Sequence, residues 1–297
     1  MDLQQLRGFF EVAREGSFTR AANKLFVTQP AISQQLKALE AEIGGQLIER
    51  RRKSLRLTPA GEILFRRTRS IFSHLDGAID EIDALKNVMR GTVTIGTSDT
   101  NCMYVLPPVL ARFRSAFPEV EVVVLNKTSV EVNQLVLDDS VDFGLVTLPA
   151  GHRELASEPL FTRQDTVICP PGHALASRRS VSLKTVAAQP VLALEQGSKS
   201  RSVMEEAFRE AGQELDVVMN LGSVEVIKRF VEIGFGIAMV PKVAVLRELE
   251  EGNLAAVSVR GMKPREIGLV FHRSRSRSAA TKALVGIAKE ELSGSRL

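Results

Sequence analysis

The sequence predicts an α+β multidomain protein that consists of a small helical module, one long helix and a two-lobed α/β domain. Three patterns support this prediction. Short amphipathic segments and surplus basic residues occupy residues 1–58, a seven-residue apolar repeat occupies residues 59–90, and strand-like segments alternate with helix-like segments in residues 91–297. The chain has 297 residues, of which 44% are hydrophobic, so it is long enough to bury several cores.

Three short helices are expected in residues 1–58. Apolar residues mark the first within residues 3–13 and the second within residues 18–25. The third is capped by Thr28, has Pro30 in its first turn, and buries a face made of Ile32, Leu36, Leu39 and Ile43. So few residues separate the second helix from the third that the two must cross steeply, which is a helix-turn-helix arrangement.

The polar face of the third helix and the basic run after it are candidate DNA contacts. On the helix we expect contacts from Thr28, Gln29, Pro30, Ser33, Gln34 and Lys37. A short hairpin follows, and its basic residues are Arg50, Arg51, Arg52, Lys53 and Arg56. In a winged module the helix reaches base edges in the major groove while the hairpin binds phosphates. The alternatives are an ordinary solvated helix face and a solvated charge run.

The distribution of charge favours the DNA-binding interpretation. Residues 1–58 carry ten Lys and Arg against six Asp and Glu, whereas residues 91–297 carry twenty-four of each kind. The net charge of +4 therefore belongs to the first module. This asymmetry predicts a module that binds a polyanion, here double-stranded DNA, attached to a neutral body.

Residues 59–90 are expected to form one long helix. Thr58 caps it, Pro59 begins it and Gly91 ends it, which gives about 45 Å of helix. Its apolar residues Ile71, Leu75, Ala78, Ile82, Leu85 and Met89 recur four and three apart, and Leu64 lies seven residues before the first of them. Burial of this seam against a second copy would make a dimer and place two recognition helices on one duplex. The alternative is that the seam packs against the chain's own C-terminal body.

The run from Leu3 to Glu62 closely resembles the N-terminal signature of LysR-type transcriptional regulators. The resemblance is carried by AANKLFVTQPAISQQLKALEAEIG, LIER and LTPAGE. It implies a winged helix-turn-helix in residues 1–58, a dimerising linker helix in residues 59–90, and a two-lobed effector-binding domain, usually in a tetramer. By position it also implies that Gln29, Pro30, Ser33, Gln34 and Lys37 read DNA and that Arg50 to Lys53 form the wing. Ile48 replaces a phenylalanine that is common in the family, and Gln34 replaces a common arginine.

The body is expected to contain two α/β lobes. Strand-like TVTIGT, VEVVVL and VDFGLVT alternate with helices, which predicts a parallel sheet in a first lobe made of residues 91–162 and 266–297. DTVICP, PVLAL, VVMNL and GIAMVP predict a second lobe in residues 163–265. The chain would cross between lobes near Leu160 to Gln164 and near Met262 to Glu266. This layout resembles the type 2 periplasmic binding-protein fold.

The carboxyl ends of the predicted strands carry the candidate effector site, because ligands of open parallel sheets bind there beside helix N-termini. The residues are Ser98, Thr100, Thr147, Ser198, Ser200 and Arg201, and the family resemblance implies the same region. Hydroxyls dominate this set, which suits a small anionic or polar metabolite with Arg201 as its counter-charge. The alternative for each hydroxyl is that it merely caps a helix.

Several other features are expected to be structural. Cys102 and Cys169 stand too far apart, without metal-ligand spacing, to indicate a zinc site or a disulfide framework. The run RSRSRS, residues 273–278, is predicted to be a solvated loop capped by Ser278 rather than a nucleic-acid tail. The sequence contains no secretion leader and no apolar run long enough for a membrane span, so a cytoplasmic protein is expected.

These expectations describe a ligand-responsive transcriptional regulator. It would bind promoter DNA as a homodimer or homotetramer, through the linker helix and effector domain, and be switched by a small metabolite. The alternative is a cytosolic small-molecule-binding protein or enzyme with an accessory basic domain. An enzyme should show paired acids, a metal cluster or an activated nucleophile in the body, and none stands out. We therefore predict no enzymatic activity, no catalytic residues, no metal and no cofactor.

Overall fold

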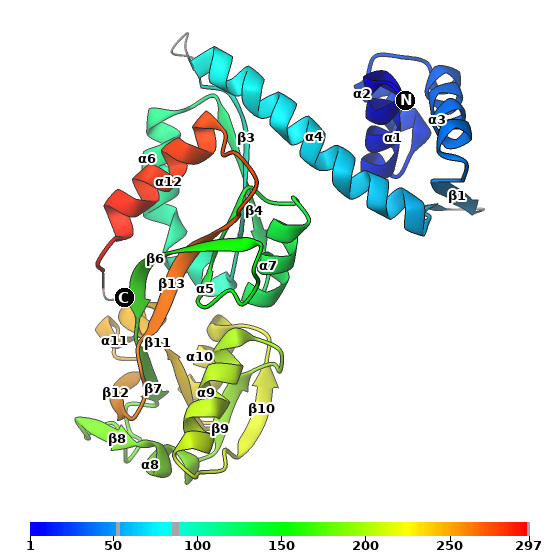
Figure 1. The fold of residues 1–297 in the computed structure, drawn as a ribbon. Coiled ribbons are helices and arrows are strands. Elements are labelled where there is room, and N and C mark those ends of the chain that lie inside the picture. Colours follow the sequence, from blue (N-terminus) through cyan, green and yellow to red (C-terminus); the bar gives the residue numbers. More distant parts are fainter. Residues whose placement is uncertain (52–53, 85–88, 296–297) are drawn as a thin grey trace. The chain divides into compact units, whose positions relative to one another are not determined.

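The computed structural model describes residues 1–51, 54–84 and 89–295, and it divides into two compact units, Met1–Glu81 and Ile82–Leu297 (Figure 1). The first unit contains a winged helix-turn-helix. Its elements are α1 (Leu3–Glu15), α2 (Phe18–Lys24), α3 (Gln29–Ile43), β1 (Ile48–Arg51), β2 (Ser54–Leu57) and most of the long helix α4 (Pro59–Ala84). β1 and β2 pair antiparallel as the expected hairpin, with Ile48 opposite Leu57.

Side-chain caps start the three short helices. The carboxylate of Asp2 accepts a hydrogen bond from the N–H of Gln5 at 2.8 Å, and the Gln5 side chain accepts one from the N–H of Asp2 at 3.1 Å, which is a capping box. The hydroxyls of Ser17 and Thr28 cap α2 and α3. Each cap satisfies a backbone donor that has no partner inside its helix, so the local sequence fixes where each helix begins.

The N-terminal half of α4 completes the core of the first unit. The ring of Phe10 in α1 lies 5.3 Å from the ring of Phe65 and 5.4 Å from that of Phe72. Among the described residues of the predicted seam, Leu64 packs against this core, whereas four are exposed, namely Ile71, Leu75, Ala78 and Ile82. The core of the first unit therefore covers the predicted seam only near the start of the helix.

The predicted end of the long helix needs correction. The described helix ends at Ala84, and Gly91 begins a strand rather than closing a helix. Leu85 lies outside the described residues. Met89 is not helical and packs against the core of the second unit, so it leaves the seam to which the repeat assigned it.

A close contact joins the two residues just before the wing to the start of α4. The hydroxyl of Thr58 donates to the carbonyl of Gln46 at 2.7 Å and accepts from the N–H of Gly61 at 3.0 Å. The α-carbon of Gly61 faces the carbonyl of Leu47, and a β-carbon there would lie 2.0 Å from that oxygen. The LTPAGE motif therefore provides both a cap and the space for the wing to lie against the helix.

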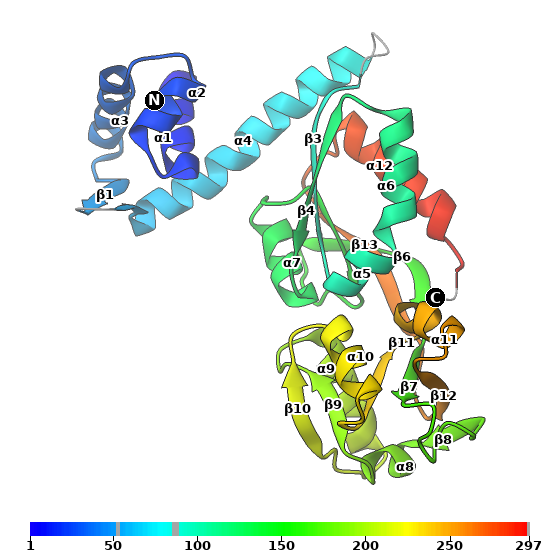
Figure 2. The same ribbon diagram turned by 180° about the vertical axis from the view of Figure 1, so that it is seen from behind.

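The first lobe of the second unit is built on a five-stranded sheet. Its order is β4-β3-β5-β13-β6, with bounds Val120–Asn126, Gly91–Thr97, Phe143–Thr147, Arg265–His272 and Leu155–Arg163. β3, β4 and β5 are parallel as predicted, while β13 pairs antiparallel with both neighbours, so the sheet is mixed. The helices are α5 (Asp99–Tyr104), α6 (Leu106–Ala116), α7 (Ser129–Leu137) and α12 (Ala279–Leu292). α6 and α12 lie side by side on one face, and α7 covers the other (Figure 2).

The second lobe has a six-stranded sheet in the order β10-β9-β11-β7-β12-β8. The strands are Val217–Leu221, Val191–Leu194, Ile237–Pro241, Asp165–Cys169, Ala255–Arg260 and Ser180–Ser182. Its helices are α8 (Leu183–Ala187), α9 (Lys199–Glu210), α10 (Val224–Glu232), the 3-10 turn η1 (Lys242–Val245) and α11 (Leu246–Glu250). The chain passes between the lobes from β6 to β7 and from β12 to β13, so the paired ends of β6 and β13 lie at the junction.

The basic run in residues 273–278 is a loop whose Ser278 caps α12, as predicted, but two of its arginines are bound to the first lobe rather than solvated. Arg275 is half-buried, and it donates to the carboxylate of Asp142 at 3.0 Å and to the carbonyl of Val141 at 3.2 Å. Arg277 donates to Glu158 at 2.7 Å. These arginines tie the segment between β13 and α12 to the first lobe, because partly buried acids of that lobe need counter-charges.

Tyr104 links the two lobes. It ends α5 in the first lobe, and its hydroxyl donates to Glu225 of α10 in the second lobe. The ammonium of Lys228 donates to the same hydroxyl at 3.0 Å and pairs with Glu248 at 2.8 Å. Burial, followed by the hydrogen bond to Glu225, raises the pKa of Tyr104 to about 12. The contact therefore depends on a neutral phenol.

Candidate functional site

The candidate DNA-reading face is the exposed side of α3. Gln34 and Lys37 are exposed one turn apart, and Ser33 beside them is half-buried. The side-chain amide of Gln29 donates to the hydroxyl of Ser33 at 2.9 Å. Thr28 caps the helix, and Pro30 is exposed in its first turn. The structure thus brings the six predicted positions together on one helix, with Gln34 and Lys37 the most accessible.

The candidate phosphate-binding element is the hairpin of β1 and β2. Arg50 and Arg51 belong to β1, and Arg56 is exposed on β2. Arg52 and Lys53 lie outside the described residues. The described part of the hairpin therefore carries basic residues on both of its strands.

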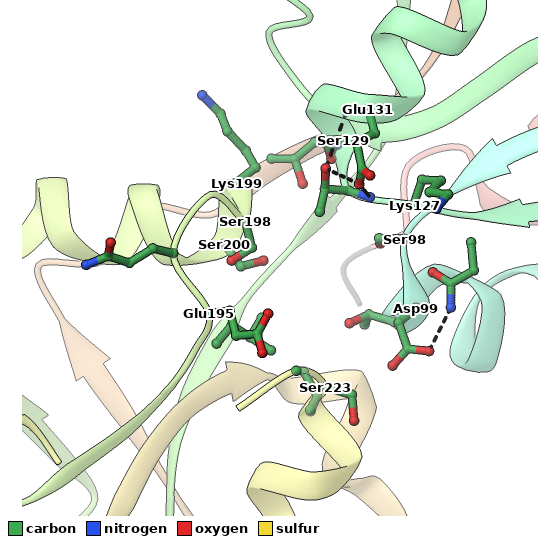
Figure 3. A pocket seen from close by; sticks show the side chains of 18 of the residues that line it. Ser98, Asp99, Lys127, Ser129, Glu131, Glu195, Ser198, Lys199, Ser200 and Ser223 are labelled. Atoms are coloured by element: carbon green, nitrogen blue, oxygen red, sulfur yellow. Dashed lines mark hydrogen bonds between the residues drawn. The ribbon is translucent and has the colours of Figure 1, made fainter. Parts of the chain in front are cut away.

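A cavity of about 470 Å³ lies between the two lobes (Figure 3). It is bounded by the ends of β5 and β6 and by the N-termini of α5, α7, α9 and α10. Its hydroxyl-bearing residues are Ser98, Thr100, Thr128, Ser129, Thr147, Ser198, Ser200 and Ser223. Helix N-termini present unpaired N–H groups and a positive dipole end, so their convergence favours an anionic or strongly polar ligand.

Five of the six residues predicted for the effector site line this cavity, namely Ser98, Thr100, Thr147, Ser198 and Ser200. The capping alternative applies to Ser198, whose hydroxyl accepts from the N–H of Arg201 at 3.1 Å. It does not apply to Ser98, whose side chain makes no cap hydrogen bond.

Arg201 does not line the cavity. Its guanidinium donates to Glu205 at 2.7 Å, to the carbonyl of Leu194 at 3.1 Å and to Asn220 at 2.9 Å. Because its guanidinium is hydrogen-bonded inside the second lobe, Arg201 is not the counter-charge for an anionic effector that the sequence suggested.

Sequence reasoning missed Arg163, which does line the cavity. It ends β6, and only 2% of its surface is exposed. Burial, followed by the neighbouring charge of Arg265, lowers the pKa of Arg163 to about 9. The side chain therefore still carries its charge at pH 7. A signal was available in the sequence, because an arginine stands at each crossing between the lobes, Arg163 and Arg265.

The thiol of Cys102, near the cavity, is not activated as a nucleophile. Cys102 is half-buried, and burial, followed by the charge of Asp99, raises the pKa of its thiol. A raised pKa leaves little thiolate at neutral pH, which makes the thiol a poor nucleophile. Within the described part of the chain, no group of His, Cys, Asp and Glu could hold a metal ion, and no helix has the length and apolarity of a membrane span.

A winged helix-turn-helix joined to a two-lobed domain with a central cavity defines a DNA-binding protein that also binds a small molecule. Two family models agree with this class. Residues 3–62 match the bacterial regulatory helix-turn-helix protein of the lysR family, and residues 86–293 match the LysR substrate binding domain. The chain belongs to the LysR family of transcriptional regulators, which carry a DNA-binding helix-turn-helix and an effector-binding domain.

Relatives and solved structures agree with this assignment. The RuBisCO operon transcriptional regulator of Allochromatium vinosum is 35% identical over 286 residues, which cover 95% of this chain and 94% of the relative. The regulator CfxR of Cupriavidus necator is 32% identical, with 93% and 87% covered. A full-length OxyR variant from Pseudomonas aeruginosa has a TM-score of 0.81 at 22% identity, with 98% and 94% covered. Full-length CbnR in complex with its target DNA has a TM-score of 0.67 at 21% identity, with 98% and 99% covered. The two structures share the fold of this chain.

Proposed function

We propose that this LysR-type regulator binds promoter DNA as an oligomer and is switched by a small anionic or polar molecule bound between its lobes. One observation carries the effector part of the proposal. Hydroxyls and helix N-termini from both lobes meet at a single cavity, so one ligand can contact both lobes at once. A ligand that binds one relative position of the lobes better than another shifts their equilibrium, and such coupling is typically worth about 1–3 kcal/mol.

We propose that α3 reads base edges and that the hairpin binds phosphates. The exposed amide of Gln34 and ammonium of Lys37 support the first role, since both have the reach and donors to contact bases in the major groove. The exposed guanidinium of Arg56 supports the second role, together with the arginines of β1. The start of the helix would lie against the DNA backbone, positioned there by Thr28, Gln29, Pro30 and Ser33.

Titration of labelled promoter DNA at several salt concentrations tests these roles. We expect Gln34→Ala to weaken binding to the promoter by about 1–3 kcal/mol and to spare binding to unrelated duplex. Arg56→Ala should weaken both kinds of binding and flatten the salt dependence, because it removes a phosphate contact. If both variants weaken both duplexes equally, the division of roles is wrong. If wild-type protein lacks salt-dependent affinity for duplex DNA, the proposed function itself fails.

We propose that the exposed seam of α4 holds two copies together. Ile71, Leu75 and Ile82 are 43%, 42% and 55% exposed, which is costly for apolar side chains in water and is relieved by pairing. Sedimentation of Ile71→Asp/Leu75→Asp should show smaller species than wild type. Arg66→Asp is the matched control, because it also adds negative charge but lies on the opposite face of the helix. An unchanged size for the double variant would exclude the seam as an interface.

We propose that the cavity, rather than another surface, receives the effector. A thermal-shift screen of metabolites should find compounds that raise the melting temperature, since a ligand bound only by the native state stabilises it. Thr100→Val keeps the shape of a buried, cavity-lining residue and removes its hydroxyl. This variant should lose the shift and keep its DNA affinity. A shift of wild-type size in the variant would argue against a contact at Thr100.

We also propose that the protein acts in the cytoplasm and by binding rather than by catalysis. The support is that its relatives at 35% and 32% identity are both named as transcriptional regulators. An effector recovered chemically unchanged after prolonged incubation with the protein is the expected result.

A further inference from the structure

The cavity offers hydrogen-bond donors on its serine side chains. Four serine hydroxyls at its wall already accept a hydrogen bond from the protein. The four bonds run from Thr147 N to Ser129 at 3.3 Å, from Arg201 N to Ser198 at 3.1 Å, from Arg265 Nη1 to Ser200 at 2.9 Å, and from Val226 N to Ser223 at 3.3 Å. Among the described residues, none of these hydroxyls donates to an acceptor. Each therefore keeps its own proton for a ligand acceptor.

Arg163 adds a charged donor with almost no partner. One terminal nitrogen of its guanidinium lies 3.4 Å from the side-chain oxygen of Asn101, which is long for a hydrogen bond. Its Nε is buried without any partner. Within the described parts of the chain, no carboxylate pairs with this guanidinium.

The neighbouring arginine, Arg265, has the carboxylate partner that Arg163 lacks. Arg265 stands opposite Arg163 in the β6–β13 pairing and is also buried. Its guanidinium pairs with the carboxylate of Asp165 and donates to the hydroxyl of Ser200. The carboxylate of Asp165 is therefore already paired. Its charge favours the cation of Arg163 less than the charge of Arg265 opposes it. A buried cation without a counter-ion is unfavourable, and a bound anion would remove that penalty.

The acidic residues at the cavity do not supply the missing charge. The carboxylate of Glu131 accepts from the N–H and hydroxyl of Thr128, at 2.9 and 2.8 Å, and that of Asp99 accepts from Asn126 at 3.1 Å. Glu195 is exposed to solvent. Figure 3 shows Glu131, Asp99 and Glu195 on separate elements around the cavity.

We propose that Arg163 is the anion-binding residue of the cavity, so that the effector carries a carboxylate, phosphate or similar oxyanion. An oxygen of this group accepts from the guanidinium of Arg163, and the remaining oxygens accept from serine hydroxyls and from the N-termini of α7, α9 and α10. The inference deepens the proposed function and rests on it. It assigns the charge of the effector to a residue of the junction strands, in place of Arg201.

Thermal unfolding of the full chain at pH 7 and constant ionic strength tests this assignment. The probes are inorganic phosphate, sulfate, acetate and malonate, with glucose as the neutral comparison. We expect at least one anion to raise the melting temperature of wild type, and the phosphate and carboxylate arms then identify the kind of oxyanion. Arg163→Gln should bind that anion roughly 10- to 100-fold more weakly. Without any anion, Arg163→Gln should melt higher than wild type, because an unpaired buried charge has been removed.

Arg201→Gln is the matched control. It also removes a buried arginine from beside the cavity, but one with satisfied partners, so it should melt lower than wild type and keep the anion response. If Arg163→Gln does not fold, Arg163→Lys replaces it. That variant keeps the charge and loses the forked donors, so a weakened response is expected.

Two results would overturn the assignment. One is an anion response of Arg163→Gln equal to that of wild type, and the other is a wild type that none of the anions stabilises. Promoter binding measured in parallel separates this failure from failure of the proposed function. A different outcome is a neutral metabolite that stabilises wild type and Arg163→Gln equally and changes the promoter affinity of both. That result would support the proposed regulator and exclude an anionic effector at Arg163.

Discussion

At the scale of single residues, Gly61 occupies a position in the first unit that leaves no room for a β-carbon. The carbonyl of Leu47 occupies the space in which a β-carbon would stand, and the hydroxyl of Thr58 binds the N–H of the same glycine. The wing and α4 therefore approach through a position that admits no side chain. Burial alone would not reveal this, because the restriction comes from the backbone of another element.

We predict that Gly61→Ala destabilises the first unit by about 1–3 kcal/mol, because the wing must move to admit the new methyl group. Gly77→Ala, in the same helix, is the control. A β-carbon at Gly77 meets nothing within 4 Å, and alanine favours the helix by up to about 1 kcal/mol. Urea unfolding of both variants measures the difference. Equal stability of the two would show that the wing adapts at no cost.

The two arginines beside the cavity show how far the sequence reaches at this scale. Hydroxyls at strand ends could be predicted because parallel strands deliver their carboxyl ends to one edge. The cationic residue of the cavity was assigned wrongly. Arg201 pairs with Glu205, four residues later on the same helix, and so does not line the cavity. Arg163 ends a strand that the sequence did not reveal. Arg163 lacks a paired carboxylate because Asp165 pairs with Arg265 instead, and this pairing is visible only in the folded chain.

At the scale of elements, the segment between β13 and α12 is held by its own arginines. A run of alternating Arg and Ser has no pattern of apolar residues. The sequence therefore gives no reason to expect that this run packs against the first lobe. The partners, Asp142 and Glu158, lie more than one hundred residues earlier. The parallel strands were predictable from their alternation with helices, whereas β6 and the antiparallel place of β13 depend on such distant contacts.

We predict that Arg275→Ala lowers the free energy of unfolding by about 3 kcal/mol, because Asp142 would be left partly buried without its counter-charge. Burial already raises the pKa of Asp142, with Arg275 acting against it. Arg273→Ala, an exposed position in the same run, should cost far less. Chemical unfolding compares the two, and similar losses would mean that the ion pair contributes little.

At the scale of the whole second unit, the cavity and the Tyr104 contact are two separate links between the lobes. α5 has its N-terminus at the cavity and Tyr104 at its other end, and α10 has Ser223 at the cavity and Glu225 on the tyrosine. A change in lobe position therefore moves both links together. The sequence predicted residues of both lobes for the cavity, but it did not indicate the Tyr104 contact, because that contact joins α5 to a helix more than one hundred residues later.

We predict that the single tyrosine of the chain titrates near pH 12 in the native protein and near pH 10 in denaturant. The neutral phenol stabilises the fold, so this contribution is complete below about pH 10 and is lost as the pH rises through 12. Ultraviolet absorbance follows the ionisation. Glu225→Gln should lower the pKa of Tyr104, whereas Glu232→Gln on the same helix should leave it unchanged. A native pKa near 10 would contradict the contact.

The position of β13 has a consequence for how the chain is made. β13 lies between β5 and β6 in the sheet of the first lobe, yet it is synthesised after every strand of the second lobe. While the ribosome is still adding residues before 265, β6 has no neighbour to bond, but all strands of the second lobe are already present. The inserted lobe can therefore complete its sheet first, and the lobe that begins earlier in the chain closes last.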